Sequence, residues 1–273
     1  MFPLAGMSPL PLLLGIISAA GAAAPAVTAP NENLIVDGLP PIPAAIAESV
    51  APYTEFRSAP FVAWHPTRRE MLVTTRFADT AQLHRVTFPG GARRQLTFFA
   101  DRVTAASYPP CPPRPPRTGG TAGDAFVFSK DTGGDEFFQN YRHDPATGIT
   151  TLLTDGKSRN SLGVWSNAGD RLAYTSTRRN RTDTDLYLVA PADAKTDHLL
   201  AAVDGGGWAP LDWSPDDRTL LVSQTISINE SHLWLFDAAS GARRALTTTP
   251  PGERVAYRGG RWARDGKSIF VAT

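Results

Sequence analysis

The stretch GVWSNAGDRLAYTS (residues 163–176) decides the fold, because the chain repeats its outline 48 residues later as LDWSPDDRTLLVSQ (residues 211–224). In both copies a tryptophan is followed by a short polar turn and then by a run of mostly small and apolar residues. Two further copies, AWHPTRREMLVTT and RWARDGKSIFVAT, bring the set of tryptophans to Trp64, Trp165, Trp213 and Trp262. Their spacings of 101, 48 and 49 residues indicate a unit of about 49 residues, with one degenerate copy near residue 115.

Each unit predicts four short strands. The tryptophan ends the first strand, a turn with Pro or small polar residues follows (HPTR, SNAG, SPDD and ARDG), and a second strand alternates with period two. A polar loop leads to a third strand (QLHRVTF, EFFQNYRHD, DLYLVAP and HLWLFDA). A second turn (PGGA, PATG, PADAK and AASGA) leads to a fourth strand (RRQLTF, TTLLTD, HLLAAV and RRALTT). Such units are typical of β-propeller blades, and we expect each tryptophan to fill the wedge between adjacent blades.

We therefore predict an all-β chain, a β-propeller of four-stranded antiparallel blades with about four blades and the start of a fifth. The ranges expected for a lead-in, the four blades and the partial blade are 31–56, 57–100, 101–155, 156–203, 204–249 and 250–273. The one helix expected lies at residues 44–51. Propellers close with four to eight blades, and the sequence stops inside a second strand, so we predict an incomplete propeller in a fragment of a longer protein. Closure with four blades, with residues 261–273 as the closing strand pair, is the alternative.

Charge and the N-terminal residues limit the partners. The 27 basic and 26 acidic residues leave a net charge of +1, so we expect neither nucleic acid nor an anionic membrane as a partner. Residues 1–30 carry no charged side chain and contain the run LPLLLGIISAAGAAA, which is typical of a secretory signal peptide, although no Lys or Arg precedes it. We expect export to the periplasm or the medium, and no membrane segment beyond that signal.

The residues around the blade starts carry a family resemblance. The pattern W-S-P-D…L-Y…L-T resembles the TolB-type propeller repeat. The ordered set KDTGGDE, SRN, TSTRRN and TDTDLY resembles the N-terminal propeller of bacterial serine peptidases of the prolyl oligopeptidase family, which includes dipeptidyl and acylaminoacyl peptidases. The resemblance spans residues 42–273. It implies a C-terminal α/β-hydrolase domain as partner, with its Ser nucleophile at a G-x-S-x-G turn, and a propeller that restricts access to short peptides.

The sequence itself lacks that active site. It contains no G-x-S-x-G, and we expect its five histidines to be surface or packing residues, so no catalytic residue is predicted. No cofactor and no metal site are predicted either, because Asp183-x-Asp185 is too short for a calcium loop. Cys111, the single cysteine, can form neither an internal disulfide nor a multi-cysteine metal site, and we interpret it as a loop residue.

The loops between second and third strands share one face in a meander, and they contain the candidate substrate-binding residues Asp135, Glu136, Arg178 and Arg179. In one interpretation, Asp135 or Glu136 pairs with Arg178, Arg179 or Arg181 of the next blade, at about 0–1 kcal/mol per surface pair. In the other, Asp135 or Glu136 binds the α-amino group of a peptide, as the resemblance to dipeptidyl peptidases implies.

Two functions follow. The first is the non-catalytic propeller of a prolyl oligopeptidase-like peptidase, which gates peptide access to a hydrolase domain absent from this chain and is inactive alone. The second is a stand-alone TolB-like propeller that binds a protein or a peptide.

Overall fold

The computed structural model describes residues 26–110, 124–249 and 252–273 of the chain. The chain divides into two compact units, residues 1–56 and residues 57–273. The first contains α1 (Ala44–Thr54), which runs three residues beyond the expected helix because helical backbone continues through Pro52, and Glu55 N–H donates to Ala51 O at 2.8 Å. Most of the predicted signal peptide, and Cys111 with its Pro-rich surroundings, lie outside the described residues.

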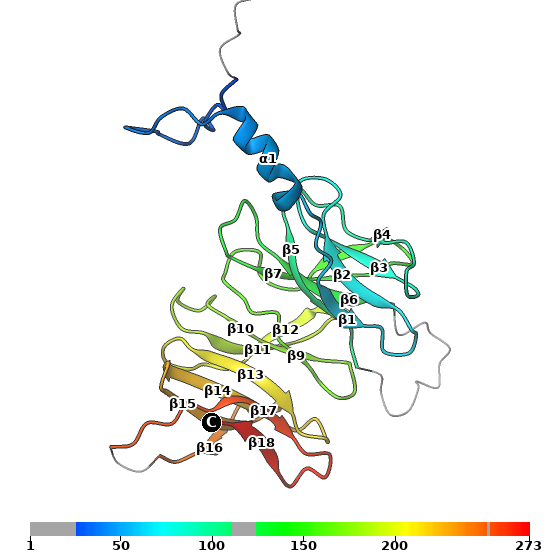
Figure 1. Cartoon of the computed structure of the whole chain (residues 1–273). Coiled ribbons are helices and arrows are strands. Elements are labelled where there is room, and N and C mark those ends of the chain that lie inside the picture. The colour runs from blue at the N-terminus through cyan, green and yellow to red at the C-terminus, as the bar shows by residue number, and fades with distance from the viewer. Residues whose placement is uncertain (1–25, 111–123, 250–251) are drawn as a thin grey trace, which may run out of the picture. The chain divides into compact units, whose positions relative to one another are not determined.

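The second unit consists of four-stranded antiparallel sheets followed by a two-stranded one (Figure 1). We number them blades 1 to 5. Blades 1 and 2 contain β1 (Phe61–Trp64), β2 (Met71–Thr75), β3 (Gln82–Val86), β4 (Arg94–Gln95), β5 (Val103–Ser107), β6 (Phe126–Lys130), β7 (Gln139–His143) and β8 (Thr150–Leu152). Blades 3 to 5 contain β9 (Val164–Trp165), β10 (Leu172–Ser176), β11 (Asp185–Ala190), β12 (Asp193–Ala201), β13 (Trp208–Trp213), β14 (Thr219–Ser227), β15 (Glu230–Asp237), β16 (Arg243–Ala245), β17 (Arg258–Trp262) and β18 (Ile269–Ala272).

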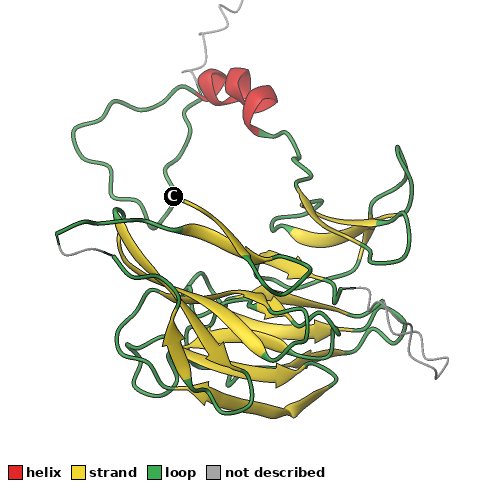
Figure 2. Ribbon diagram, turned by 90° about the horizontal axis from the view of Figure 1, so that it is seen from below, coloured by secondary structure: helices red, strands yellow, loops and turns green. Residues whose placement is uncertain are grey.

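In every blade each strand pairs with the next one along the chain, which is the meander of a propeller blade. Strands account for nearly all of the regular structure of this unit (Figure 2). The predicted fold class is therefore confirmed: the chain is all-β, with four complete propeller blades and two strands of a fifth among the described residues.

The repeat of the sequence is also a repeat of register. Each of the four tryptophans pairs with the residue seven positions later, across the turn between first and second strands: Trp64 with Met71, Trp165 with Leu172, Trp213 with Leu220 and Trp262 with Ile269. The short polar turns are therefore equivalent in space, and the first strands of successive blades meet, as β9 meets β13 and β13 meets β17.

Apolar side chains fill the seams between blades. Leu72 and Leu83 of blade 1 pack with Phe126 and Phe128 of blade 2. The seam between blades 2 and 3 has a core of its own, which includes Tyr174. The seam between blades 3 and 4 holds a larger core, and that between blades 4 and 5 a smaller one. Sheet-on-sheet burial of this kind is what stabilises the unit.

The tryptophans fill these seams, as expected, with one exception. Trp165 Nε1–H donates to Ser107 Oγ of blade 2 at 2.9 Å, and buried Trp213 donates to Val164 O of blade 3 at 3.2 Å. Trp262 packs against the core between blades 4 and 5. Trp64 is 65% exposed, because no blade precedes β1 among the described residues. The prediction is therefore wrong for Trp64.

Blade 2 shows where the missing tryptophan went. Ser107 pairs with Val127, so the next residue, Tyr108, lies where the other blades have Trp. Tyr108 is buried against Phe126 and against His65 of blade 1, with ring centroids 5.8 and 4.9 Å apart. The degenerate blade start is therefore at residue 108 and not near 115, because the Pro-rich insertion follows the aromatic residue.

Two loops are shorter than the sequence predicts. Residues 226–231 were expected to be a loop, but β14 and β15 form a long hairpin in which Ser227 pairs with Glu230. The expected turn PADAK is mostly strand, because β12 begins at Asp193, opposite Ala190. In both places hairpin pairing continues through polar residues that the hydrophobic pattern alone does not mark as strand.

Candidate functional site

The candidate residues lie on one side of the propeller, which we call the loop face. It is formed by the loops between second and third strands and by the connectors between blades. Because the strands of a blade alternate in direction, each first strand begins at this face and each fourth strand ends there. Asp135 and Glu136 follow β6, and Arg178 and Arg179 follow β10, so the four residues share the loop face in adjacent blades.

The loop with Asp135 and Glu136 is held by its own carboxylates. Glu136 N–H donates to Asp131 Oδ2 at 3.1 Å, and Phe137 N–H donates to Asp135 Oδ1 at 2.8 Å. Asp101, in the preceding connector, accepts Gly133 N–H at 2.9 Å. Glu136 has a left-handed backbone with φ 61°, which only Gly adopts without cost. The loop is therefore fixed, and it presents the Glu136 side chain to solvent.

The charge partner of Glu136 is Arg159. Its guanidinium lies 3.9 Å from Glu136 Oε2, and both side chains are more than half exposed. The same guanidinium lies over the ring of Phe137, 5.4 Å from its centroid. An exposed pair at this distance contributes little to stability, about 0–1 kcal/mol. Both groups are therefore accessible to a ligand on the loop face.

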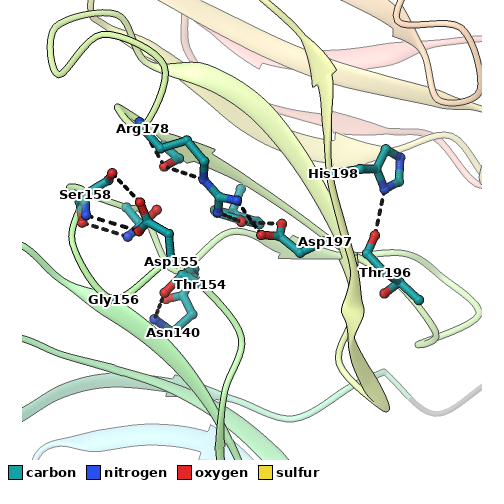
Figure 3. A network of polar contacts seen from close by, with 12 residues as sticks. Asn140, Thr154, Asp155, Gly156, Ser158, Arg178, Thr196, Asp197 and His198 are labelled. Atoms are coloured by element: carbon teal, nitrogen blue, oxygen red, sulfur yellow. Dashed lines mark hydrogen bonds and ion pairs between the residues drawn. The ribbon is translucent and has the colours of Figure 1, made fainter.

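Arg178 instead points into blade 3 (Figure 3). It donates to Asp197 Oδ2 at 2.5 Å and to the Tyr174 hydroxyl, which itself donates to Asp197 Oδ1. The guanidinium also lies over the ring of Tyr187, 4.2 Å from its centroid. Its donors and its π face are thus used by residues of the same blade.

Burial and charge act on this cluster together. Burial and the hydrogen bond to Asp197 raise the pKa of Tyr174 well above its usual range. Burial opposes the charge of Arg178, but the hydrogen bond to Asp197 and the field of Asp155 outweigh it, so the pKa of Arg178 is raised. Arg178 therefore keeps its charge and Tyr174 its proton, which is a structural arrangement and not an acid–base one.

Arg179 is likewise bound within its own blade. It forms two hydrogen bonds to Asp185, one to Asp183 at 2.8 Å and one to Val203 O at 2.9 Å. The bonds to Asp185 are the main reason that the pKa of Arg179 is raised. The Nε and Nη2 donors of Arg179 are therefore used within the blade.

The structure thus separates the four candidates. Glu136 pairs with Arg159 and not with the arginines expected from the sequence, while Arg178 and Arg179 are occupied by blade 3 carboxylates. Asp135 is committed to its own loop. The substrate-binding role of these four residues stays a prediction.

Sequence reasoning missed a set of anchoring residues, which start the third strands of the first three blades. Gln82 binds Phe99 O and Asp101 O, Gln139 binds Ser158 O and Gly156 N, and Asp185 accepts Val203 N–H. Each is buried and fixes the connector to the next blade. Alignment of the repeats on the register Thr75–Gln82, Lys130–Gln139 and Ser176–Asp185 would have marked the position as polar in all three blades.

The recurrent L-T of the fourth strands also has a physical role. The hydroxyl of Thr97, Thr154 or Thr247 accepts the backbone N–H of Leu83, Asn140 or Leu233. The threonine thus provides the acceptor for a third-strand donor at the point where the fourth strand ends.

Three of the five histidines belong to the packed interior. His65, His84 and His143 are buried in blades 1 and 2, and burial lowers the pKa of His84 and His143. Over residues 26–110, 124–249 and 252–273, no group of three His, Cys, Asp or Glu could hold a metal ion. Within the same ranges, no helix is long and apolar enough to span a membrane.

Comparison with known proteins supports the fold. A puromycin hydrolase structure is similar with a TM-score of 0.56 and 19% identity, over 80% of this chain and 36% of that one. A structure from a study of two prolyl endopeptidases has a TM-score of 0.53 and 12% identity, over 77% of this chain and 32% of that one. TolB from Acinetobacter baumannii has a TM-score of 0.51 and 16% identity, over 78% of this chain and 48% of that one.

At these identities the likeness shows a β-propeller fold alone, and the chain spans between about a third and a half of the three proteins. No protein-family model matches the chain, and no curated protein matches it.

Proposed function

We propose that this chain is the propeller of a serine peptidase of the prolyl oligopeptidase type, and that its loop face covers a C-terminal α/β-hydrolase domain and admits short peptides to it. One observation carries the proposal. Large apolar side chains are exposed on the loop face, from blades 1, 2 and 4 and a connector: Phe77, Phe98, Phe137, Ile226 and Ile228. Large apolar side chains exposed on several loops of one face suit a surface that meets another protein surface.

Chain direction supports the same face. Each fourth strand ends on it, so a domain that follows a complete blade is attached there. The likeness to the prolyl endopeptidase and puromycin hydrolase structures agrees with this proposal, because those chains are about three times as long as the part that this chain covers. We further propose that residues 1–30 direct export, since they lack any charged side chain.

The test compares two proteins, this chain and the longer protein from the same reading frame. We expect a G-x-S-x-G downstream, labelling of the longer protein by a fluorophosphonate, and no labelling of this chain. The longer protein should cleave short peptides and leave folded proteins intact. Substitution of Phe137 and Ile228 by Glu should weaken that size limit, whereas Phe88→Glu, in a short turn on the opposite face, should not. A longer protein that carries no reactive serine would refute the proposal.

A stand-alone TolB-like propeller is the second candidate. The likeness to TolB from Acinetobacter baumannii favours it, because 48% of that chain is covered, more than of the prolyl endopeptidase or the puromycin hydrolase structure. In that case the reading frame ends after closing blades, and the loop face binds a protein or peptide directly. Capture of a defined partner that is lost with Phe137→Glu would support this second function.

A further inference from the structure

A cavity of about 400 Å³ opens on the loop face at the seam between blades 4 and 5. Its volume lies within the range of small-molecule sites, about 300–1,000 Å³. Hydroxyl side chains of the β14–β15 hairpin line one side, and Tyr257 and Arg258 line the other. None of the candidate residues predicted from the sequence lines it.

The hydroxyl lining follows from the period of β14. Leu221 is buried in the seam core, and the next residues on the same side of the strand are Ser223, Thr225 and Ser227. The strand side that faces blade 5 is therefore apolar inside the seam and hydroxylic where it reaches the loop face. Ser231 on β15 then binds Tyr257 in both directions: it accepts Tyr257 N–H at 2.8 Å and donates to Tyr257 O at 2.9 Å.

The preceding seam shows why this one is open. Leu172 pairs with Val189 as Leu220 pairs with Phe236, which makes Thr184 equivalent to Ser231. Arg179 and Ser227 each come seven residues after the paired leucine, in the loop of blade 3 and in the hairpin of blade 4. Between blades 3 and 4, Thr184 Oγ1 accepts the N–H of buried Trp208, and Arg179 binds the connector through Val203 O. Between blades 4 and 5, Ser227 is smaller than Arg179 and Tyr257 is only half-buried, and the cavity lies beside them.

Charge at the cavity is unbalanced. Arg258 is exposed and forms no ion pair or hydrogen bond through its side chain within the described part of the chain. The nearby carboxylate of Glu230 pairs with Arg254 at 3.8 Å and lies 3.5 Å from Nε2 of His232. Ser227 Oγ accepts Asn229 N–H, so its own proton is free to donate. The cavity thus offers one free guanidinium and hydroxyl donors, which together suit a carboxylate.

We propose that this cavity binds a carboxylate of a short peptide, with Arg258 as its counter-ion and the hydroxyls of Thr225 and Ser227 as further donors. The choice of a peptide rests on the gating function proposed above. The carboxylate comes either from the C-terminus or from an acidic side chain, and the two sources share the same chemistry.

The experiment measures binding to this purified chain by calorimetry, without any hydrolase domain. The probes are acetyl-Ala-Ala as the free acid, the same dipeptide as its amide, and acetyl-Glu-amide. We expect the free acid, acetyl-Glu-amide or both to bind about tenfold more tightly than the dipeptide amide, because the bond to Arg258 is charge-assisted. Arg258→Gln should remove that difference, and Thr225→Val should reduce it. Arg264→Gln, which changes an exposed arginine outside the cavity, should leave it intact.

The acid that binds identifies the source of the carboxylate. Equal affinity for acid and amide, binding of none of the probes, or an equal loss in Arg264→Gln and Arg258→Gln would each overturn the inference. Since the measurement needs no peptidase activity, its failure is distinguishable from failure of the gating function, which is tested by hydrolysis in the longer protein.

Discussion

Arg179 holds the fully buried carboxylate of Asp185 in a two-bonded ion pair, Nε to Oδ2 at 2.7 Å and Nη2 to Oδ1 at 3.0 Å. The same carboxylate accepts Val203 N–H, and the same guanidinium donates to Val203 O. The pair therefore fixes the connector from blade 3 to blade 4 through both the N–H and the C=O of Val203. Asp185 and Val203 are 18 residues apart in the sequence. Arg179, which the sequence places in a polar loop, therefore has a structural role.

Asp185→Ala should strongly destabilise the chain, because it removes the acceptor of Val203 N–H and two of the hydrogen bonds of the Arg179 guanidinium. Removing one partner of a buried pair costs about 3–5 kcal/mol, and the partial exposure of Arg179 places the expected loss in free energy of unfolding near the lower end. Urea denaturation measures it. Glu136→Gln, in an exposed pair, is the control and should change stability by no more than about 1 kcal/mol. Equal losses in the two variants would contradict the assignment.

The contribution of a repeated tryptophan to stability should depend on whether a preceding blade covers its side chain. Trp213→Ala should cost about 3–5 kcal/mol, because it opens a cavity in the core between blades 3 and 4. Trp64→Ala, at the same repeat position, should cost less than about 1 kcal/mol, because its side chain is mostly exposed. The two midpoints of urea denaturation are compared directly. A loss at Trp64 as large as that at Trp213 would indicate that β1 is covered by another blade in solution.

The fold was predictable because the Trp-turn-strand unit recurs along the sequence at a spacing of about 49 residues. The Trp-turn-strand unit fixes the register of all the tryptophans, and alternation marks the second and third strands. What could not be predicted is local pairing through polar residues, as in the β14–β15 hairpin, where strand and loop have the same composition. The position of Tyr108 in the repeat could not be predicted either, because the sequence does not show where the insertion in blade 2 begins.

Thr154→Val tests the role of the repeated threonine. The exchange keeps the shape of the side chain and removes the acceptor of Asn140 N–H and the donor to Gln139 Oε1. A buried donor without a partner costs about 1–3 kcal/mol, and that loss is expected for Thr154→Val. Thr154→Ser keeps the hydroxyl and is the matched control. Hydrogen exchange at the Asn140 amide should become faster in the Val variant alone; unchanged exchange there would contradict the proposed acceptor.

Only part of the candidate site could be predicted. The sequence placed Asp135, Glu136, Arg178 and Arg179 correctly on adjacent loops of one face, because strand alternation fixes the side on which a loop emerges. It could not assign the ion pairs, since the partners Asp197 and Arg159 lie 19 and 23 residues away from Arg178 and Glu136. The cavity beside Arg258 could not be predicted either. It depends on which positions between blades 4 and 5 have small side chains, and these positions are known only from the strand register.

Asp155 should make stability depend on pH in acid. Burial opposes its charge, but hydrogen bonds from Ser158 and Lys157 and the field of Arg178 outweigh it, so the folded pKa lies below the ordinary 3.8. A lowered pKa contributes stability above pH 3.8 that is lost as the pH falls through the folded value. Asp155→Asn should therefore be less stable than the original chain at pH 7 and equal to it near about pH 2. Ser158→Ala, which removes one of the hydrogen bonds, should fall between them. Urea midpoints from pH 7 to about pH 2 measure the difference, and a difference that is the same at every pH would show that Asp155 acts through packing and not through its charge.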